Sequence, residues 1–300
     1  MSATSAIKDL VRPPFANYDI VVYFGCGLFA LPLAHHYFIE PSAFRFPRFT
    51  FDIGMGFADE AISALSLLFA VYLLGHIIAY SGSLIIEKSI DVFFGKVSSA
   101  ILLSSYASSG NKRELISAWQ FGRWKNAFQS GRGPQNILRV FAHLPAIPLY
   151  VFVTLIGGFD YYRGRVPRHV LFLAKQKLHT DGHGPVTLYD PWYKTLEHDV
   201  INNHPGATGR MYNYLVISGL FRSLTILFLS CLWAELYYYA HSLVDGHYLL
   251  KPLMSDEQSR FAHLFSFLLL YIAYGFSISS YMKFQRRYAE EAIFAYVLAR

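Results

Sequence analysis

Residues 214–233 have the sequence YLVISGLFRSLTILFLSCLW, and this stretch decides the class of fold. It matches the length of about 20 residues that a helix needs to cross a bilayer. Its one charged residue is Arg222, about halfway along the stretch. A charge at the centre of a membrane helix costs about 2.5–3.5 kcal/mol on insertion scales and usually marks a functional site. The stretch therefore predicts a membrane helix with Arg222 as a candidate functional residue.

The composition of the whole chain agrees with a membrane protein. Of its 300 residues, 54% are hydrophobic and 15% are charged, whereas soluble domains have about 25% charged residues. The net charge of +6 does not require nucleic acid as a partner, because basic residues on the cytoplasmic loops of membrane proteins raise the charge in the same way. Nucleic acid is therefore not an expected partner.

Four apolar stretches predict four transmembrane helices, at about residues 18–38, 61–86, 212–237 and 261–282. Basic residues outnumber acidic ones twofold in residues 89–210, whereas acidic residues prevail in the two short connections between spans. Because Lys and Arg collect on the cytoplasmic side, the middle region and both termini are expected to be cytoplasmic. The first span lacks a small-residue cleavage site, so no cleaved signal peptide is expected.

The predicted architecture is an all-α integral membrane protein in three parts. Residues 1–88 hold the first pair of spans, residues 89–210 form a basic, irregular helical subdomain at the cytoplasmic membrane surface, and residues 211–300 hold the second pair and a cytoplasmic tail. Residues 140–159 are uncharged over the length of a span, but Pro145 and Pro148 interrupt a helix there. We interpret 140–159 as a re-entrant or interfacial segment.

Polar side chains recur at helical spacing on the second and third spans. On the second span they are His76, Tyr80, Ser83 and Glu87, and on the third they are Ser218, Arg222 and Thr225. Polar groups in membrane helices tend to face the bundle interior or a water-filled path. These residues are therefore predicted to form an intramembrane polar network, with structural hydrogen bonds between helices as the alternative. Candidate partners of Arg222 are Glu87 and the last-span residues Tyr274, Ser277 and Tyr281.

Small residues mark a helix-packing face on the second span. Gly75, Ala79 and Ser83 repeat at four-residue spacing, a pattern that lets another helix approach closely. The same face would also serve a homo-oligomer.

Histidines of the middle region predict a metal site as an alternative. His179 and His183 have the i, i+4 spacing that places two imidazoles on one metal in a helix, and His198 and His204 follow. Zinc or iron would suit such ligands. However, Gly182 and Gly184 favour a loop, in which that spacing has no meaning.

No motif of the zincin, serine-hydrolase or nucleotide-binding type is found. The leading expectation is therefore a non-enzymatic membrane protein, channel-like or an effector or scaffold component. Its basic cytoplasmic region would bind anionic lipid or a soluble protein partner. The first alternative is a His-rich membrane metalloenzyme that acts on a lipid-like substrate. The second is a small transporter, although the internal repeats common in transporters are not visible.

Overall fold

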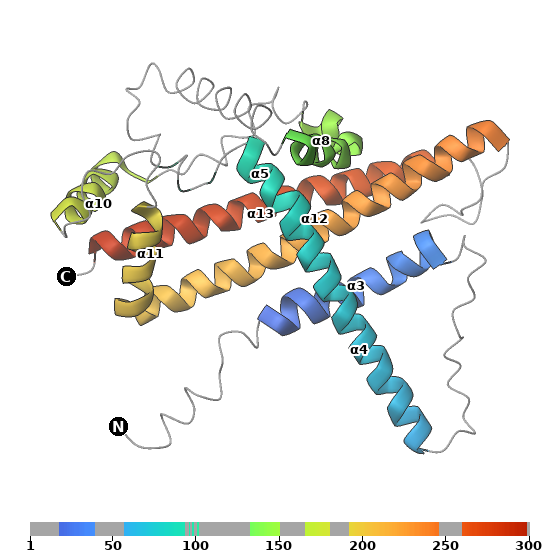
Figure 1. The fold of residues 1–300 in the computed structure, drawn as a ribbon, viewed down its shortest axis with the longest axis horizontal. Coiled ribbons are helices and arrows are strands. Elements are labelled where there is room, and N and C mark those ends of the chain that lie inside the picture. Colours follow the sequence, from blue (N-terminus) through green and yellow to red (C-terminus); the bar gives the residue numbers. More distant parts are fainter. Residues whose placement is uncertain are drawn as a thin grey trace. The chain divides into compact units, whose positions relative to one another are not determined.

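A computed structural model of the chain is all-helical, with no strand, in the part that it describes (Figure 1). That part comprises residues 18–39, 57–93, 96, 98, 101, 133–150, 166–180, 192–245 and 260–298. Four helical stretches are long and apolar enough to cross a membrane: Asp19–Phe38, Ala61–Asp91, Pro205–Val244 and Phe261–Leu298. The prediction of an all-α chain with four such helices is confirmed.

The first two apolar stretches contain turns of π-helix. The first is built from π-helix η1 (Asp19–Phe24), α3 (Gly25–Ala34) and π-helix η2 (His35–Ile39). Pro32 inside α3 lacks a backbone N–H and so removes one hydrogen bond from the helix. The second stretch is built from α4 (Phe57–Gly82), π-helix η3 (Ser83–Glu87) and α5 (Lys88–Phe93).

The last two apolar stretches belong to helices that are longer than a bilayer requires. α12 (Pro205–Asp245) has 41 residues and α13 (Arg260–Leu298) has 39, about twice the length of a span. Pro205 opens α12 at a position where its missing N–H has no partner in any helix. The last span was predicted to end near residue 282 and to be followed by a helical tail; α13 includes both, since residues 289–292, AEEA, are strong helix formers.

The chain divides into two compact units. The first unit takes Met1–Ser83 and Gly219–Ile278, and the second takes Leu84–Ser218 and Ser279–Arg300. The boundary therefore cuts α12 and α13, so that each of these helices contributes one segment to each unit.

In the first unit, two glycines bring the first and second apolar stretches into backbone contact. A Cβ at Gly27 would lie 1.9 Å from the carbonyl oxygen of Val71, and a Cβ at Gly75 would lie 1.8 Å from the carbonyl oxygen of Tyr23. Both distances are far below van der Waals contact, so only glycine fits at these two positions. Tyr23 meets Gly75 and Gly27 meets Val71, so the two helices have an antiparallel sense at this contact, where α3 and α4 cross at a steep angle (Figure 1).

The first stretch also packs on α12, and here the two helices are parallel. The thiol of Cys26 donates to the carbonyl of Leu220 at 3.8 Å. Farther along both helices, the hydroxyl of Tyr238 donates to the carbonyl of Tyr37 at 3.0 Å. α3 therefore lies against both α4 and α12 in this unit.

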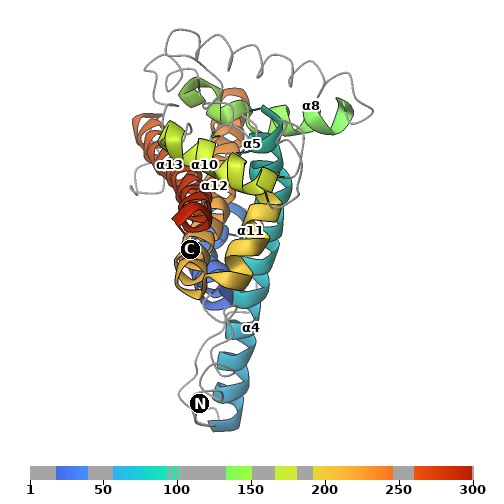
Figure 2. The same ribbon diagram turned by 90° about the vertical axis from the view of Figure 1, so that its left-hand side faces the viewer.

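α12 and α13 form an antiparallel pair and lie side by side in both views (Figures 1 and 2). In the first unit, the rings of Phe221 and Phe276 meet with their centroids 5.8 Å apart. In the second unit, the amide nitrogen of Gln285 donates to the hydroxyl of Ser218 at 2.8 Å. Successive apolar helices therefore alternate in direction, as successive membrane crossings would.

The core of the second unit joins α10 (Arg168–Thr180) and α11 (Trp192–Asn203) to segments of α12 and α13. On α10 and α11, the buried apolar residues recur every three or four positions and so form one stripe on each helix. Burial of these stripes supplies the main force that holds the two helices in place. The members of the cluster are Ile101, Val166, Val170, Leu171, Ala174, Leu178, Trp192, Leu196, Val200, Ala207, Met211, Ala289, Ala292, Ile293 and Tyr296.

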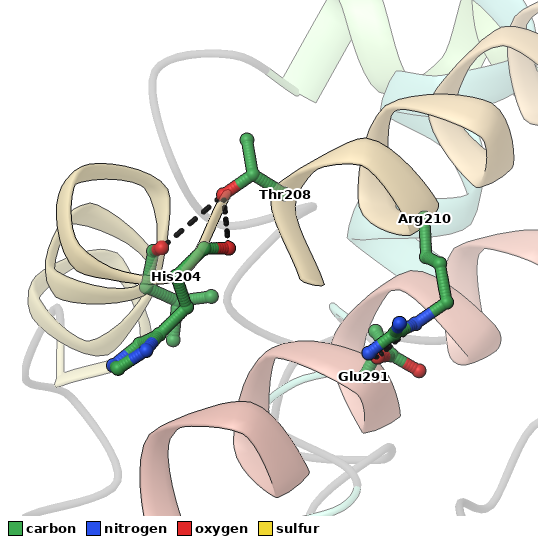
Figure 3. A network of polar contacts seen from close by, with 5 residues as sticks. His204, Thr208, Arg210 and Glu291 are labelled. Atoms are coloured by element: carbon green, nitrogen blue, oxygen red, sulfur yellow. Dashed lines mark hydrogen bonds and ion pairs between the residues drawn. The ribbon is translucent and has the colours of Figure 1, made fainter. Parts of the chain in front are cut away.

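Polar contacts fix the turn between α11 and α12 (Figure 3). The hydroxyl of Thr208 lies within hydrogen-bond distance of the carbonyls of Val200, at 3.2 Å, and His204, at 3.0 Å. Both carbonyls also accept a backbone N–H, Val200 from His204 and His204 from Thr208, so the hydroxyl of Thr208 adds a second donor to each. Arg210 forms an ion pair with Glu291 of α13 at 2.7 Å. Because the side chain of Arg210 is 60% exposed, this pair adds at most about 1 kcal/mol.

The predicted re-entrant or interfacial segment 140–159 is described as far as residue 150. It begins in α8 (Gly133–Ala142), continues through the 3₁₀ turn η4 (Leu144–Ala146) and ends in a short helical stretch. α8 packs on α5 within the second unit. Residues 151–159 lie outside the described part of the chain.

Candidate functional site

The predicted polar residues of the second apolar stretch do not gather in one cluster. His76 stacks on Tyr23 with ring centroids 3.7 Å apart, and Tyr72 meets the same imidazole edge to face at 4.5 Å. Tyr80 is 68% exposed and therefore points away from the interior of the first unit. Ser83 belongs to the first unit and Glu87 to the second. His76 thus sits in an aromatic cluster on the face that contacts the first stretch.

Arg222 contacts the beginning of the first apolar stretch. Its guanidinium donates to the hydroxyl of Tyr18 at 3.4 Å, a long hydrogen bond. Tyr18 directly precedes η1, so the guanidinium of Arg222 reaches toward the beginning of the first stretch, whereas the backbone of the neighbouring Leu220 lies beside Cys26. A charge near the end of a span can reach the interface, and its burial therefore costs less than at the centre.

The other polar residues of the α12 stripe serve different contacts. Thr225 donates to the carbonyl of Phe221 in its own helix at 2.7 Å. Ser218 accepts from Gln285 in the second unit. The packing residue Gly75 contacts the backbone of Tyr23, as described above, and Ala79 is buried at 4% exposure.

A buried polar cluster of the first unit joins three of the apolar helices. The hydroxyl of Tyr37 donates to Oε1 of Glu235 at 2.9 Å. The other carboxyl oxygen, Oε2, lies 3.2 Å from Nδ1 of His263. Tyr37 comes from η2, Glu235 from α12 and His263 from α13. We call these three residues the Tyr37–Glu235–His263 network.

Water is excluded from this network. Tyr37, Glu235 and His263 are 0%, 1% and 2% exposed. Burial of a carboxyl or an imidazole is unfavourable unless its polar atoms are hydrogen-bonded, and here both carboxyl oxygens have a partner. The carboxyl group is therefore held between a phenol and an imidazole, both from other helices.

π-helical turns accompany the polar contacts of the first unit. Tyr37 lies in η2, and Tyr23, which stacks on His76, lies in η1. π-turns within α-helices are rare and occur frequently at functional sites, because one extra residue in the turn redirects the side chains around it. The π-turns η1 and η2 thus coincide with the positions of Tyr23 and Tyr37, which make the polar and aromatic contacts of this unit.

The Tyr37–Glu235–His263 network was not predicted from the sequence, although part of the signal is visible there. Glu235 is the one acidic residue in residues 212–237, and His263 lies near the beginning of the next apolar stretch. In an antiparallel helix pair, residues at equal distances from the connecting segment face each other. Applied to the predicted spans 212–237 and 261–282, this rule would have indicated the contact between Glu235 and His263. Tyr37 is distant in sequence, and only the packing of α3 on α12 brings it to the carboxyl group.

The predicted metal ligands lie only partly in the described chain. His183 is outside it, whereas His179 is exposed at the end of α10. The Nε2 atom of His198 pairs with the amide of Asn202 at 3.0 Å, and His204 lies in the turn before α12. Within the described residues, no group of three or more His, Cys, Asp or Glu side chains is placed to hold a metal. The metal site stays a prediction.

A buried histidine of the second unit gives a pH-dependence prediction. Burial lowers the pKa of His143 to about 4 from its usual value of 6.5, and a hydrogen bond with the backbone of Ile85 offsets only part of this. The folded state therefore holds the neutral ring, and the unfolded chain binds a proton as the pH falls below about 6.5. We expect the free energy of unfolding to decrease by ~3 kcal/mol between pH 6.5 and 4.

Thermal unfolding in detergent across this pH range measures the effect. His143→Phe should remove this part of the pH dependence, whereas replacement of the exposed His169 by Gln should leave it unchanged. Parallel pH profiles for wild type and His143→Phe would contradict the assignment.

Comparison with known proteins gives no match, since neither a protein-family model nor a curated protein nor a solved structure corresponds to this chain.

Proposed function

We propose that this chain is a non-enzymatic integral membrane protein, either channel-like or an effector or scaffold component. Its four apolar helices would cross the bilayer, and its basic region, residues 89–210, would lie at the cytoplasmic surface. There it would bind anionic lipid or a soluble protein partner. Each Lys or Arg close to an anionic leaflet adds about 1 kcal/mol to such binding.

The observation that carries this proposal is the Tyr37–Glu235–His263 network. Ionisable residues inside membrane helices are rare and mark ion paths and proton relays. A carboxyl group buried between helices is not needed for stability, because apolar residues of similar volume often stabilise a core as well or better. Its presence at the meeting point of three apolar helices therefore supports a functional role.

Buried polar atoms between Arg222 and Glu235 support a path for a proton or a small cation along α12. The two charged residues are separated by thirteen positions, which corresponds to about 20 Å along a helix. Between or beside them, Ser223, Cys231 and Cys26 of the neighbouring α3 are all fully buried. Hydroxyl and thiol groups there offer intermediate sites for a proton or a small cation.

Flux measurements in proteoliposomes test the proposal. Wild-type protein should carry proton or monovalent-cation flux above that of protein-free vesicles. Arg222→Leu and Glu235→Gln should each lower the flux by at least about tenfold, which corresponds to a barrier increase of about 1.4 kcal/mol.

Ser230→Ala is the matched control on α12. The hydroxyl of Ser230 donates to the carbonyl of Ile226 in its own helix at 2.9 Å and is not part of the Tyr37–Glu235–His263 network. This variant should retain wild-type flux. Vesicles with wild-type protein that are as tight as empty ones, or unchanged flux in both charge variants, would refute the channel-like function.

A further inference from the structure

α8 has the reverse of the burial pattern found in a water-soluble helix. Its buried or half-buried side carries Asn136, Arg139 and, in the turn after the helix, His143. Its outward side carries Ile137 and Leu138, which are 61% and 68% exposed. Phe141, Leu144 and Ile147 continue the outward side with exposures of 57%, 45% and 40%. We call Ile137, Leu138, Phe141, Leu144 and Ile147 the α8 apolar face.

The polar side of α8 is held by specific contacts with the end of the second apolar stretch. The guanidinium of Arg139 donates to the carbonyl of Leu84 in η3 at 3.4 Å and to Oδ1 of Asn136 at 2.6 Å. The imidazole of His143 interacts with the backbone of Ile85 in the same π-turn. These contacts fix the orientation of α8, so the outward direction of its apolar face is built into the second unit.

A helix of the same unit shows the opposite arrangement. The inward side of α10 is apolar, with Val170, Leu171, Ala174 and Leu178 in the core, although Phe172 and Leu173 are exposed on its other side. The inversion in α8 is therefore a local property and not a general feature of the unit. An apolar face turned outward is unfavourable in water, since each fully exposed large aliphatic side chain forgoes about 1.5–3 kcal/mol of burial.

The position of α8 indicates what covers this face. η3 lies within the candidate span Ala61–Asp91, where the apolar sequence gives way to Glu87 and Lys88. This is the place where a span would leave the hydrocarbon layer. An amphipathic helix held at that level lies with its apolar side about 5–10 Å deep in the boundary between headgroups and acyl chains.

We propose that α8 is an interfacial helix whose apolar face inserts into the bilayer, while Arg139 and His143 tie it to the end of the second span. This inference rests on the membrane integration in the proposed function. It assigns lipid, and not a second protein, as the occupant of the α8 apolar face.

Fluorophore labelling of single introduced cysteines tests the occupant. Leu138→Cys and Phe141→Cys report on the α8 apolar face, and Lys194→Cys, at an exposed position of α11, is the matched control. The native Cys26 and Cys231 are free but fully buried, and the parent protein measures any background labelling. The full-length variants are reconstituted into phosphatidylcholine vesicles containing phosphatidylglycerol, with or without a quencher attached to the acyl chains.

The labels at positions 138 and 141 should be quenched by the lipid-borne quencher and should be several-fold less accessible to aqueous iodide than the label at 194. Equal iodide quenching at 138, 141 and 194 would overturn the proposal. Protection from both quenchers would also overturn it, because protein and not lipid would then cover the face.

A third site separates failure of this inference from failure of the proposed function. Leu68 is 49% exposed on α4 within a candidate span, so a label at Leu68→Cys should be quenched from the acyl chains in any membrane-integrated form. Lipid quenching at 68 without quenching at 138 would refute only the interfacial helix. Absence of lipid quenching at 68 would refute membrane integration and, with it, the role of α8.

Discussion

Glu235→Ala is expected to lower the free energy of unfolding by about 3–5 kcal/mol, because loss of one partner of a buried ionisable pair leaves the other without compensation. The imidazole of His263 would lose the carboxyl oxygen at 3.2 Å, and the hydroxyl of Tyr37 would lose its acceptor at 2.9 Å. Water cannot replace the missing groups, since these side chains are at most 2% exposed. Thermal unfolding in detergent, compared with wild type, measures the loss.

A further variant distinguishes a structural role of the network from a functional one. The triple variant Tyr37→Phe/Glu235→Met/His263→Leu replaces the three polar side chains by apolar ones of similar size and should recover most of the stability. It should not recover ion flux in proteoliposomes, because no proton-binding group remains. Wild-type stability in Glu235→Ala would contradict the buried network, and wild-type flux in the triple variant would show that the network is purely structural.

Gly75→Ala and Gly27→Ala are expected to destabilise the first unit severely, each by about 3 kcal/mol or more, the upper end of the range for overpacked cores. The added methyl group would lie 1.8 Å from the carbonyl oxygen of Tyr23 in one case and 1.9 Å from that of Val71 in the other. These atoms belong to the backbone of a neighbouring helix, so a side-chain rotation cannot relieve the overlap. The first and second apolar stretches would have to separate.

Gly206→Ala and Gly209→Ala provide the matched controls for this prediction. Both glycines lie in α12, and a Cβ at either position would meet nothing within 4 Å. Replacement of glycine by alanine inside a helix normally stabilises by about 0.5–1 kcal/mol, so these variants should unfold at or above the wild-type temperature. If all four variants behaved alike in thermal unfolding, the close approach of α3 and α4 would be refuted.

The prediction of the apolar helices and the prediction of the polar stripe depend on different properties of the chain. The four apolar helices were predicted well because hydropathy over about 20 residues is a property of the local chain. The predicted stripe of His76, Tyr80, Ser83 and Glu87 assumed one face of an uninterrupted α-helix. The π-turn η3, which begins at Ser83, changes the angular position of the residues that follow, so this assumption does not hold.

The predicted role of Arg222 shows a similar limit. Its position in the apolar stretch was evident, and its distance from Glu235 along α12 excluded a direct pair. Its contact with Tyr18 follows from the parallel packing of the first stretch on α12, which hydropathy does not reveal. The same packing brings Tyr37 to Glu235.

By itself, the sequence determined the helical class, the number and approximate positions of the apolar helices, and the glycine that lets another helix approach α4 closely. These properties follow from composition, hydropathy and residue size, each readable within one segment. Only the tertiary structure decided that Tyr37, Glu235 and His263 meet, and that α8 turns its polar side inward. Both features depend on which faces of separate helices are in contact, and that choice is made by packing between segments far apart in the chain.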